Sequence, residues 1–226
     1  MIEIKNIEVY GLNKAINAIG NSFNVGEINT SLSLSDDSSK WKTAEKLGGD
    51  MSSHQSHDAF LKGILVEYDI KLNGAFQPEF MRYTVGQNFI MQQSTMHSLK
   101  KLMNENFDPY TKYVSEESRE IVKKYYNQWV ETQKKLAEGT ASNKDVYEAK
   151  MKLIHNIPRG IELWATISSN YLQLKTQVIQ RARHPQAEDW HSFIKFCYSL
   201  PKFRELCGFK DKTWDLENIF PILYEN

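Results

Sequence analysis

The sequence predicts one α+β domain, in which an antiparallel sheet is combined with long helices. Residues 1–11 and 63–72 alternate apolar and polar residues as strands do, whereas residues 116–138 have a long helical pattern. Strands and helices follow one another irregularly, which fits an α+β domain better than a doubly wound parallel sheet. The chain has no repeat and no long linker, so we expect residues 1–226 to form a single domain.

In the N-terminal half, two helices are expected besides these strands. A short helix at residues 41–47 is predicted to end at two consecutive glycines. The segment 48–57 is polar, contains two histidines and is expected to be a flexible loop. In residues 89–103 the apolar side chains recur with helical spacing, which predicts a second helix.

The long helix of the C-terminal half has clear end signals. Ser115 is a good N-cap residue for it, and Gly139 follows its last turn. Ser142 and Asp145 have the spacing of a capping box, which predicts that the next helix begins there and runs to about residue 155. Pro158 cannot continue that helix.

Three more elements complete the expected order. Residues 160–167 are predicted to be a short strand. A helix from Ser169 to Arg183 follows, capped by Ser168 or Ser169. A last amphipathic helix is predicted at residues 187–199.

The composition excludes several classes of protein. Lys plus Arg and Asp plus Glu both number 28, which argues against a dominant nucleic-acid or membrane surface but leaves room for a local anion pocket. No apolar run reaches transmembrane length, and the N-terminus lacks the apolar stretch of a signal peptide. Two cysteines, Cys197 and Cys207, form no disulfide framework, so we expect buried thiols and a cytoplasmic location.

Common catalytic and metal-binding motifs are missing from the sequence. It contains no phosphate loop, no GxGxxG after a strand, no GxSxG and no dense metal-ligand spacing. His54 and His57 lie three residues apart in the polar loop, where exposed histidines are expected rather than a metal pair. We therefore expect no metal site.

The expected helix at residues 169–183 carries a polar stripe. Asn170, Leu174, Gln177 and Arg181 are separated by four, three and four residues, which places them on one helix face about 16 Å long. Such a face can line a groove for an extended polar ligand, and the guanidinium of Arg181 suits a phosphate. The alternative is a solvated stripe on a surface helix.

A second group of polar residues interrupts the helix predicted at residues 89–103. It consists of Gln92, Gln93, Ser94 and His97. Buried amides and hydroxyls need hydrogen-bond partners, so these groups either pair internally or face a ligand. Arg82 precedes them and is expected to reach the same site or to form a surface ion pair.

The spacing of the C-terminal stripe resembles that of the flavin-dependent thymidylate synthases. Asn170 lies twelve residues after Pro158, and Arg181 lies eleven residues after Asn170. The family has an LP pair, an Asn and an Arg in this register, and here no gap is needed. The resemblance extends over most of the chain and is weakest at the N-terminus.

Two further segments carry the resemblance. Gln92, Gln93 and Ser94 stand where the family motif RHRxxSxNExSxR has Glu-x-Ser. Upstream, the segment SHDAFLKGILVEYDI resembles a His-rich turn and strand of the family, and His57 matches the first histidine of that turn.

The chain also departs from the family motif. Counted back from Ser94 without a gap, the RHR triplet falls on Thr84, Val85 and Gly86. The motif Glu is replaced by Gln92, and the final motif Arg by Met96. In the family these positions hold flavin and the nucleotide phosphate.

The resemblance implies a reaction, its cofactors and a site. Family members are homotetramers with active sites shared between subunits. FAD is the cofactor, NADPH and methylenetetrahydrofolate are co-substrates, and dUMP is methylated reductively to dTMP. The resemblance implies catalytic roles for Arg181 and Ser94, substrate contacts from Arg181, Gln92, Gln93, Ser94 and His97, and cofactor contacts from His57, Arg82, Asn170 and Gln177. Residues 104–114 are a candidate substrate lid.

Three interpretations stay open from the sequence. The chain is a divergent thymidylate synthase, or a relative that alkylates another pyrimidine nucleotide. Alternatively, it is a nucleotide-binding or regulatory protein that kept the fold and lost flavin chemistry, which the missing RHR triplet favours. In the third interpretation it is an unrelated α+β interaction protein, and the spacing match is chance. Bound flavin separates the first from the others, and nucleotide-induced thermal stabilisation without flavin supports the second.

Overall fold

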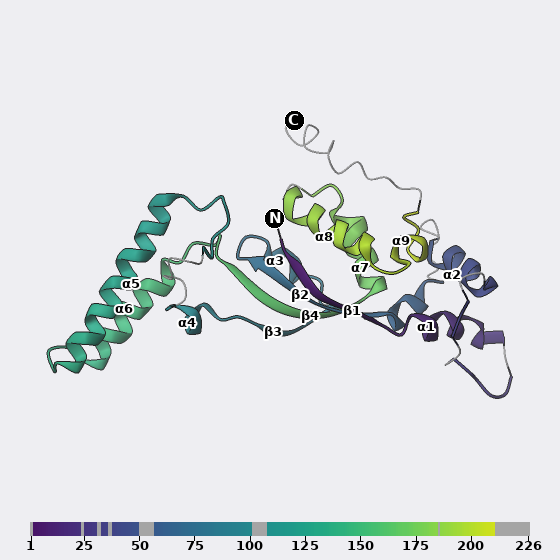
Figure 1. Ribbon diagram of the computed structural model, residues 1–226, viewed down its shortest axis with the longest axis horizontal. Helices are drawn as coiled ribbons and strands as arrows, with labels where there is room; N and C mark the ends of the chain where they lie inside the picture. The colour runs from purple at the N-terminus through teal and green to yellow at the C-terminus, as the bar shows by residue number, and fades with distance from the viewer. Residues whose placement is uncertain are drawn as a thin grey trace, which may run out of the picture. The chain divides into compact units, whose positions relative to one another are not determined.

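The structure is a computed structural model that describes residues 2–23, 25–30, 33–35, 38–49, 57–100, 108–184 and 186–210. Within these residues an antiparallel sheet of four strands is combined with helices (Figure 1), which confirms the α+β prediction. The strand order is β1-β2-β4-β3. The strands are β1 Ile4–Tyr10, β2 Leu65–Asn73, β3 Asn88–Gln92 and β4 Glu162–Asn170.

The helices range from a single turn to six turns. The α-helices of the described residues are α1 Leu12–Ala18, α2 Ser39–Gly49, α3 Gln77–Phe80, α4 Thr95–Ser98, α5 Glu116–Ala137, α6 Asn143–His155, α7 Tyr171–Arg181, α8 Ala187–Ser199 and α9 Phe203–Leu206, with 3-10 helices η1 Ile19–Phe23 and η2 Ala59–Gly63. No helix in the described part of the chain is both long and apolar enough to cross a membrane.

The chain divides into two compact units. The first unit consists of Met1–Ile70, Met81–Ile90 and Thr166–Asn226, and the second of Lys71–Phe80 and Met91–Ala165. That the whole chain acts as one domain stays a prediction.

The core of the first unit is aromatic. Strand β2 buries alternate side chains, among them Tyr68, as a strand with one covered face does. The ring of Tyr68 lies 4.8 Å from that of Phe196 on α8, between ring centroids. On the same helix, Trp190 and Phe193 are both fully buried and meet edge to face at 5.8 Å. Helix α8 is therefore anchored on the sheet by large rings.

The second unit contains a pair of long helices, α5 and α6, which lie side by side (Figure 1). Both predicted N-caps are confirmed: Ser115 accepts a hydrogen bond from the backbone of Ser118, and Ser142 forms the capping box with Asp145. Gly139 follows α5 with φ of 74°, the left-handed conformation that ends many helices. The N-terminal ends of both helices are thus determined by capping residues that can be recognised in the sequence.

Buried residues of α5 and α6, together with Leu99 and Ile161 from outside the pair, form a small hydrophobic core. It consists of Leu99, Val122, Trp129, Leu153 and Ile161. The indole of Trp129 contacts the ring of Tyr126 edge to face, with 5.9 Å between the ring centroids.

The helix predicted at residues 89–103 is wrong for its first part. Residues Asn88–Gln92 form strand β3, and only Thr95–Ser98 are helical before the described segment ends at Lys100. A short apolar run is compatible with either structure, and pairing with the neighbouring strand decides it here. Just beyond β3, the backbone N–H of Gln93 donates to the carbonyl oxygen of Trp164, at 2.9 Å.

The strand before α7 is longer than predicted, and the helix begins later. Ser168 and Ser169 belong to β4, and the N-cap is Asn170, whose side chain accepts from the backbone N–H of Gln173 at 3.0 Å. The helix ends at Arg181, not at residue 183. Asn is as good an N-cap as Ser, so the sequence alone did not separate the candidates.

Helix α2 contains the two glycines that were expected to end it. It runs from Ser39 to Gly49. A Cβ atom added to Gly48 would overlap the carbonyl oxygen of Leu206, so close packing against α9 explains a glycine at this position. The predictions about His54 and about residues 104–107 of the candidate lid lie outside the described residues. Cys197 and Cys207 are buried free thiols, as predicted.

Candidate functional site

The polar stripe of α7 lies on the inner side of the helix. Leu174 and Gln177 are fully buried, and Asn170 and Arg181 are half-buried. A solvated stripe is therefore the wrong interpretation for this face. Because buried polar groups need partners, the contacts of these residues show what the face does.

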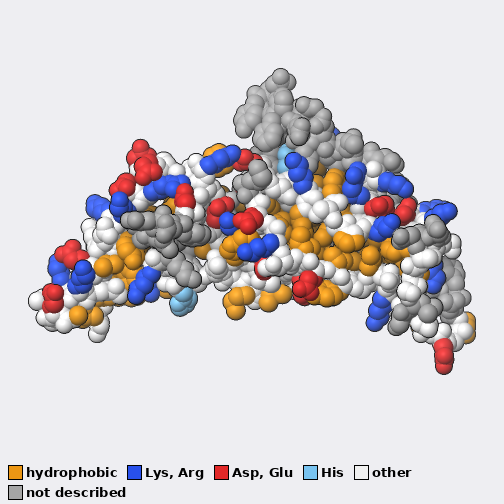
Figure 2. Space-filling model, viewed as in Figure 1, with side chains coloured by type: hydrophobic (Ala, Val, Ile, Leu, Met, Phe, Trp, Pro, Cys, Tyr) orange, Lys and Arg blue, Asp and Glu red, His pale blue; other side chains and the backbone are white. Residues whose placement is uncertain are grey.

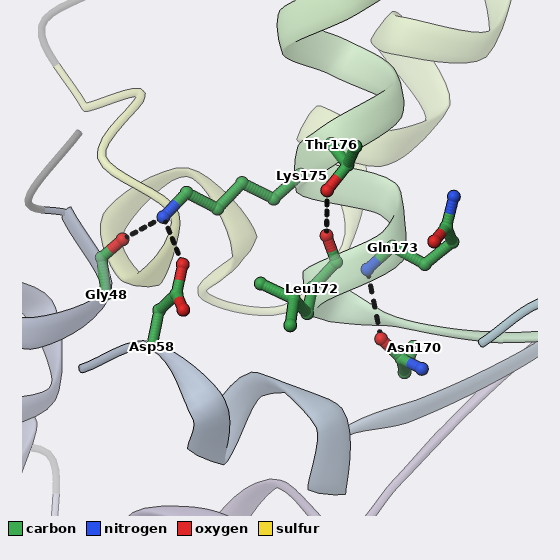
Figure 3. Close-up of polar contacts among 7 residues, drawn as sticks. All are labelled: Gly48, Asp58, Asn170, Leu172, Gln173, Lys175 and Thr176. Carbon is green, nitrogen blue, oxygen red and sulfur yellow. Dashed lines mark hydrogen bonds and ion pairs between the residues drawn. The ribbon is translucent and has the colours of Figure 1, made fainter. Parts of the chain in front are cut away.

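At the N-terminal end of α7, Asn170 uses both ends of its amide. Its Oδ1 caps the helix through the backbone of Gln173, as Figure 3 shows, and its Nδ2 donates to the carbonyl oxygen of Gly86 at 3.2 Å. Gly86 has φ of 81°, and a Cβ there would lie 2.5 Å from Nδ2 of Asn170. The segment around Gly86 is thus fitted closely against the start of the helix.

In the middle of the stripe, two glutamine side chains meet in the protein interior. The Nε2 of Gln177 donates to the Oε1 of Gln87 at 3.0 Å, and both residues are buried. The Oε1 of Gln177 has no hydrogen-bond partner among the described residues. This acceptor is a buried polar atom whose desolvation is not offset by a protein hydrogen bond.

At the C-terminal end, Arg181 lies beside the rings of Tyr83 and Trp190, and these contacts are here called the clamp. Its Nε donates to the hydroxyl of Tyr83 at 2.6 Å, and this hydroxyl donates to Oε1 of Gln180 at 3.1 Å. The guanidinium carbon lies 5.3 Å from the ring centroid of Tyr83 and 5.1 Å from that of Trp190. A guanidinium held in this way has a fixed orientation and a cation–π contact on each ring.

The three contacts share one feature. Residues 83–87, here called the stripe-facing segment, lie along α7, with Tyr83 at the C-terminal end of the helix and Gly86 at its N-terminal end. Sequence reasoning missed Tyr83 and Gln87. The one signal was the family motif, whose RHR triplet falls at residues 84–86 when counted back from Ser94.

The predicted nucleotide contacts of the second unit are partly paired within that unit. Gln92 exchanges two side-chain hydrogen bonds with Gln77, at 2.8 and 3.0 Å. The Oε1 of Gln93 accepts from the backbone N–H of Trp164 at 3.1 Å. Ser94 occupies the N-cap position of α4 without a side-chain capping bond. For Gln92 the structure therefore favours internal pairing over a ligand-facing role.

The remaining predicted site residues are exposed. Arg82 and His57 belong to the first unit and His97 to the second. The stripe residues Asn170, Gln177 and Arg181 are the predicted residues that the structure brings together through one partner segment.

A buried titratable group, His191, follows Trp190 on α8. Burial lowers the pKa of His191, an effect partly opposed by its hydrogen bond to the backbone of Ala182 and reinforced by the charge of Lys195. Lys and Arg side chains are intermixed with Asp and Glu on the visible face (Figure 2). No group of three or more His, Cys, Asp or Glu that could hold a metal occurs among the described residues.

Two solved structures of flavin-dependent thymidylate synthase (ThyX) from Helicobacter pylori, both with FAD and dUMP, match this chain with a TM-score of 0.58. The match covers 93% of this chain and 98% of each of those chains, at 16% identity. The fold is that of the flavin-dependent thymidylate synthases.

A further structure, the UMP/dUMP methylase PolB from Streptomyces cacaoi with 5-Br dUMP, matches 77% of this chain and 76% of its own, at 12% identity and a TM-score of 0.44. No family model and no curated protein sequence matches the chain. At 16% identity, the likeness to the two ThyX structures establishes the fold, and the function has to be argued from the residues.

Proposed function

We propose that this chain binds dUMP or a related pyrimidine nucleotide and is a nucleotide methyltransferase-like protein on the ThyX fold. The fold covers nearly the whole chain, and the two ThyX structures contain dUMP. The observation that carries the proposal is the clamped guanidinium of Arg181, which stands at the position of the family arginine in the ungapped register from Pro158.

The clamp gives Arg181 the properties of a phosphate-binding group. Its Nε is used by Tyr83, and Trp190 supports the guanidinium plane, so little side-chain entropy is left to lose when an anion binds. A fixed guanidinium is also selective for planar or tetrahedral anions through paired N–H donors. In the proposal Arg181 binds the phosphate or the pyrimidine edge. Ser94, Gln93 and His97 stay predicted nucleotide contacts from the motif match.

The finer proposal is the family reaction, reductive methylation of dUMP to dTMP with FAD, methylenetetrahydrofolate and NADPH. Flavin binding in the family uses the RHR triplet, which here falls on Thr84, Val85 and Gly86. Thr84 and Val85 are exposed and uncharged, and the carbonyl of Gly86 is taken by Asn170. These residues do not fit the flavin diphosphate, so we derive no catalytic step through flavin. A homotetramer and a cytoplasmic location belong to the same proposal.

The misfit at the triplet favours a second candidate function. In it the chain is a nucleotide-binding or regulatory protein that kept the fold and the arginine but has no flavin chemistry. Asn170 is paired with Gly86 at the triplet position, which weakens the case for flavin chemistry. Arg181 is hydrogen-bonded to Tyr83, outside the triplet, so the proposed nucleotide binding does not depend on the triplet.

The binding proposal is tested by calorimetric titration of dUMP into the wild type and the Arg181→Ala, Arg181→Lys and Arg183→Ala variants. Loss of a charge-assisted hydrogen bond costs about 1.5–3 kcal/mol, so Arg181→Ala is expected to bind roughly ten- to a hundred-fold more weakly. Arg183 is exposed, and its variant removes the same charge from outside the clamp. Equal dUMP affinity in wild type and Arg181→Ala would refute the proposal.

Flavin retention separates the enzyme from the binding protein. The purified protein is mixed with FAD, desalted, and its absorption recorded from about 300 to 550 nm, followed by an assay of dTMP formation from dUMP with methylenetetrahydrofolate and NADPH. Retained flavin together with dTMP formation establishes the family reaction. Binding of dUMP without retained flavin leaves the second candidate.

A further inference from the structure

Part of the stripe-facing segment covers the polar stripe of α7. Residues 84–87, here called the strap, accept hydrogen bonds from both amide side chains of the stripe. The carbonyl oxygen of Gly86 accepts from Asn170, and Oε1 of Gln87 accepts from Gln177. Because Gln177 is fully buried, a ligand can reach its amide only when Gln87 moves away. The strap and a ligand on this face would therefore compete for the same groups.

The strap has few apolar contacts that hold it closed. Thr84, Val85 and Gly86 are exposed, Val85 to 84%, and Gln87 is the one buried residue of the strap. No residue of the strap belongs to a helix or a strand. A segment with few buried apolar contacts opens locally at a low cost in free energy. We therefore expect the strap to open without unfolding of the sheet.

The two ends of the strap are fixed. Tyr83 precedes the strap, is buried and accepts the hydrogen bond from Nε of Arg181. Asn88 follows the strap and begins β3. Opening of the strap can thus uncover Asn170 and Gln177 while the clamp at Arg181 stays in place.

The amide of Gln177 has an unused hydrogen-bond acceptor. Its Oε1 is buried and has no hydrogen-bond partner among the described residues, a cost in free energy that an incoming donor would offset. An amide presents an acceptor and a donor side by side, which matches the N–H and the adjacent carbonyl oxygen of a uracil edge. Gln177 lies one helical turn, about 6 Å, from Arg181 along α7. One ligand can therefore place its phosphate on Arg181 and its base near Gln177.

We propose that the strap is autoinhibitory: it occupies the part of the stripe that binds the base, and a pyrimidine nucleotide held at Arg181 displaces it. The amide of Gln177 exchanges its bond to Gln87 for hydrogen bonds to the base. Gln177, which the family resemblance implied as a cofactor contact, thereby becomes a specificity-determining residue for the base. The inference rests on the proposed binding of dUMP at Arg181 and adds to it a contact that regulates access.

The strap is tested by calorimetric titration of dUMP and of deoxyribose 5-phosphate, which carries no base. In Gly86→Ala the added methyl group would overlap Nδ2 of Asn170, which loosens the strap and leaves the stripe residues unchanged. Apparent affinity rises with the fraction of binding-competent molecules, so this variant should bind dUMP roughly tenfold more tightly than the wild type. Its affinity for deoxyribose 5-phosphate should be unchanged. Gly139→Ala, where nothing lies within 4 Å of the added Cβ, is the control and should bind both compounds as the wild type does.

A second strap variant, Gln87→Ala, removes the acceptor for Nε2 of Gln177 and keeps the test decisive if Gly86→Ala does not fold. It should also bind dUMP more tightly, whereas a purely structural role of the strap predicts weaker binding. Wild-type binding of dUMP without tighter binding in any folded strap variant overturns the strap and leaves the proposed function standing. Absence of dUMP binding to the wild type and to the strap variants overturns both.

The role of Gln177 is tested in the Gly86→Ala background, in which the strap is already loosened. Gln177→Met keeps the length of the side chain and removes its donor and its acceptor. We expect the double variant to bind dUMP roughly tenfold more weakly than Gly86→Ala, because the hydrogen bonds to the base are lost. Its affinity for deoxyribose 5-phosphate should be the same as that of Gly86→Ala. Equal dUMP affinity in the two variants would overturn the assignment of the base to Gln177.

Discussion

The Nε of Arg181 donates to the hydroxyl of Tyr83 at 2.6 Å, across 98 residues of sequence. The same guanidinium faces Trp190, whose ring meets that of Tyr83 edge to face at 6.0 Å. The three side chains therefore fix one another, and the orientation of the arginine is set by the fold before any ligand arrives. This is the geometric basis of the proposed anion site.

Replacing Tyr83 by Phe is expected to lower the free energy of unfolding by about 1–2 kcal/mol. The substitution keeps the ring and removes the hydroxyl, so the half-buried Nε–H of Arg181 loses a charge-assisted bond. Urea unfolding measures the change. Tyr147→Phe, at a side chain that is 62% exposed, is the control and should be neutral. A Tyr83→Phe variant as stable as the control would mean that this hydrogen bond contributes nothing.

The buried glutamine pair can be tested with a double-mutant cycle. Gln87→Leu leaves Nε2 of Gln177 without this acceptor in the interior, and we expect a loss of about 1–3 kcal/mol in the free energy of unfolding. Gln177→Leu should cost a similar amount. The double variant should lose less than the sum, by at least about 0.5 kcal/mol, because no polar partner is then stranded. Additive losses would show that the two amides act independently.

Alanine substitutions at two glycines with nearly the same φ can distinguish the cost of backbone strain from the cost of a steric clash. Gly86 and Gly139 have φ of 81° and 74°, so Ala at either position is strained by about 1–2 kcal/mol. Only at Gly86 does the added Cβ meet a neighbour, Nδ2 of Asn170, whereas nothing lies within 4 Å at Gly139. Gly86→Ala should therefore be the more destabilising variant in thermal unfolding. Equal losses would argue against a close fit of the segment to the helix.

Elements that depend on neighbours in the sequence were predicted well. The N-caps predicted at Ser115 and Ser142 and the helix predicted at residues 187–199 are confirmed. Each of these predictions depends on residues that are close together in the sequence. Strand β3 was not predicted, because a five-residue segment is too short for its pattern to distinguish a strand from a helix.

The candidate site was predicted in part for a related reason. The spacing predicted Asn170, Gln177 and Arg181 on one helix face; Gln177 and Arg181 lie on α7, whereas Asn170 ends β4 and caps the helix. Their partners in the stripe-facing segment lie 84 to 98 residues earlier in the chain. Residues 83–87 have no periodic pattern of their own, so only the fold brings them to the helix.

The last prediction concerns pH and rests on His191. Burial lowers its pKa in the folded protein below the ordinary value of 6.5, which it regains on unfolding. Between the two values the unfolded chain binds more protons, so the stability contributed by neutral His191 is complete above pH 6.5 and is lost as the pH falls toward the folded pKa. His191→Gln removes this titration and should flatten the stability–pH curve below pH 6.5, measured by urea unfolding. His155→Gln, at an exposed position, should leave the curve unchanged. A curve for His191→Gln that falls as steeply as the wild type would assign the acid sensitivity to other groups.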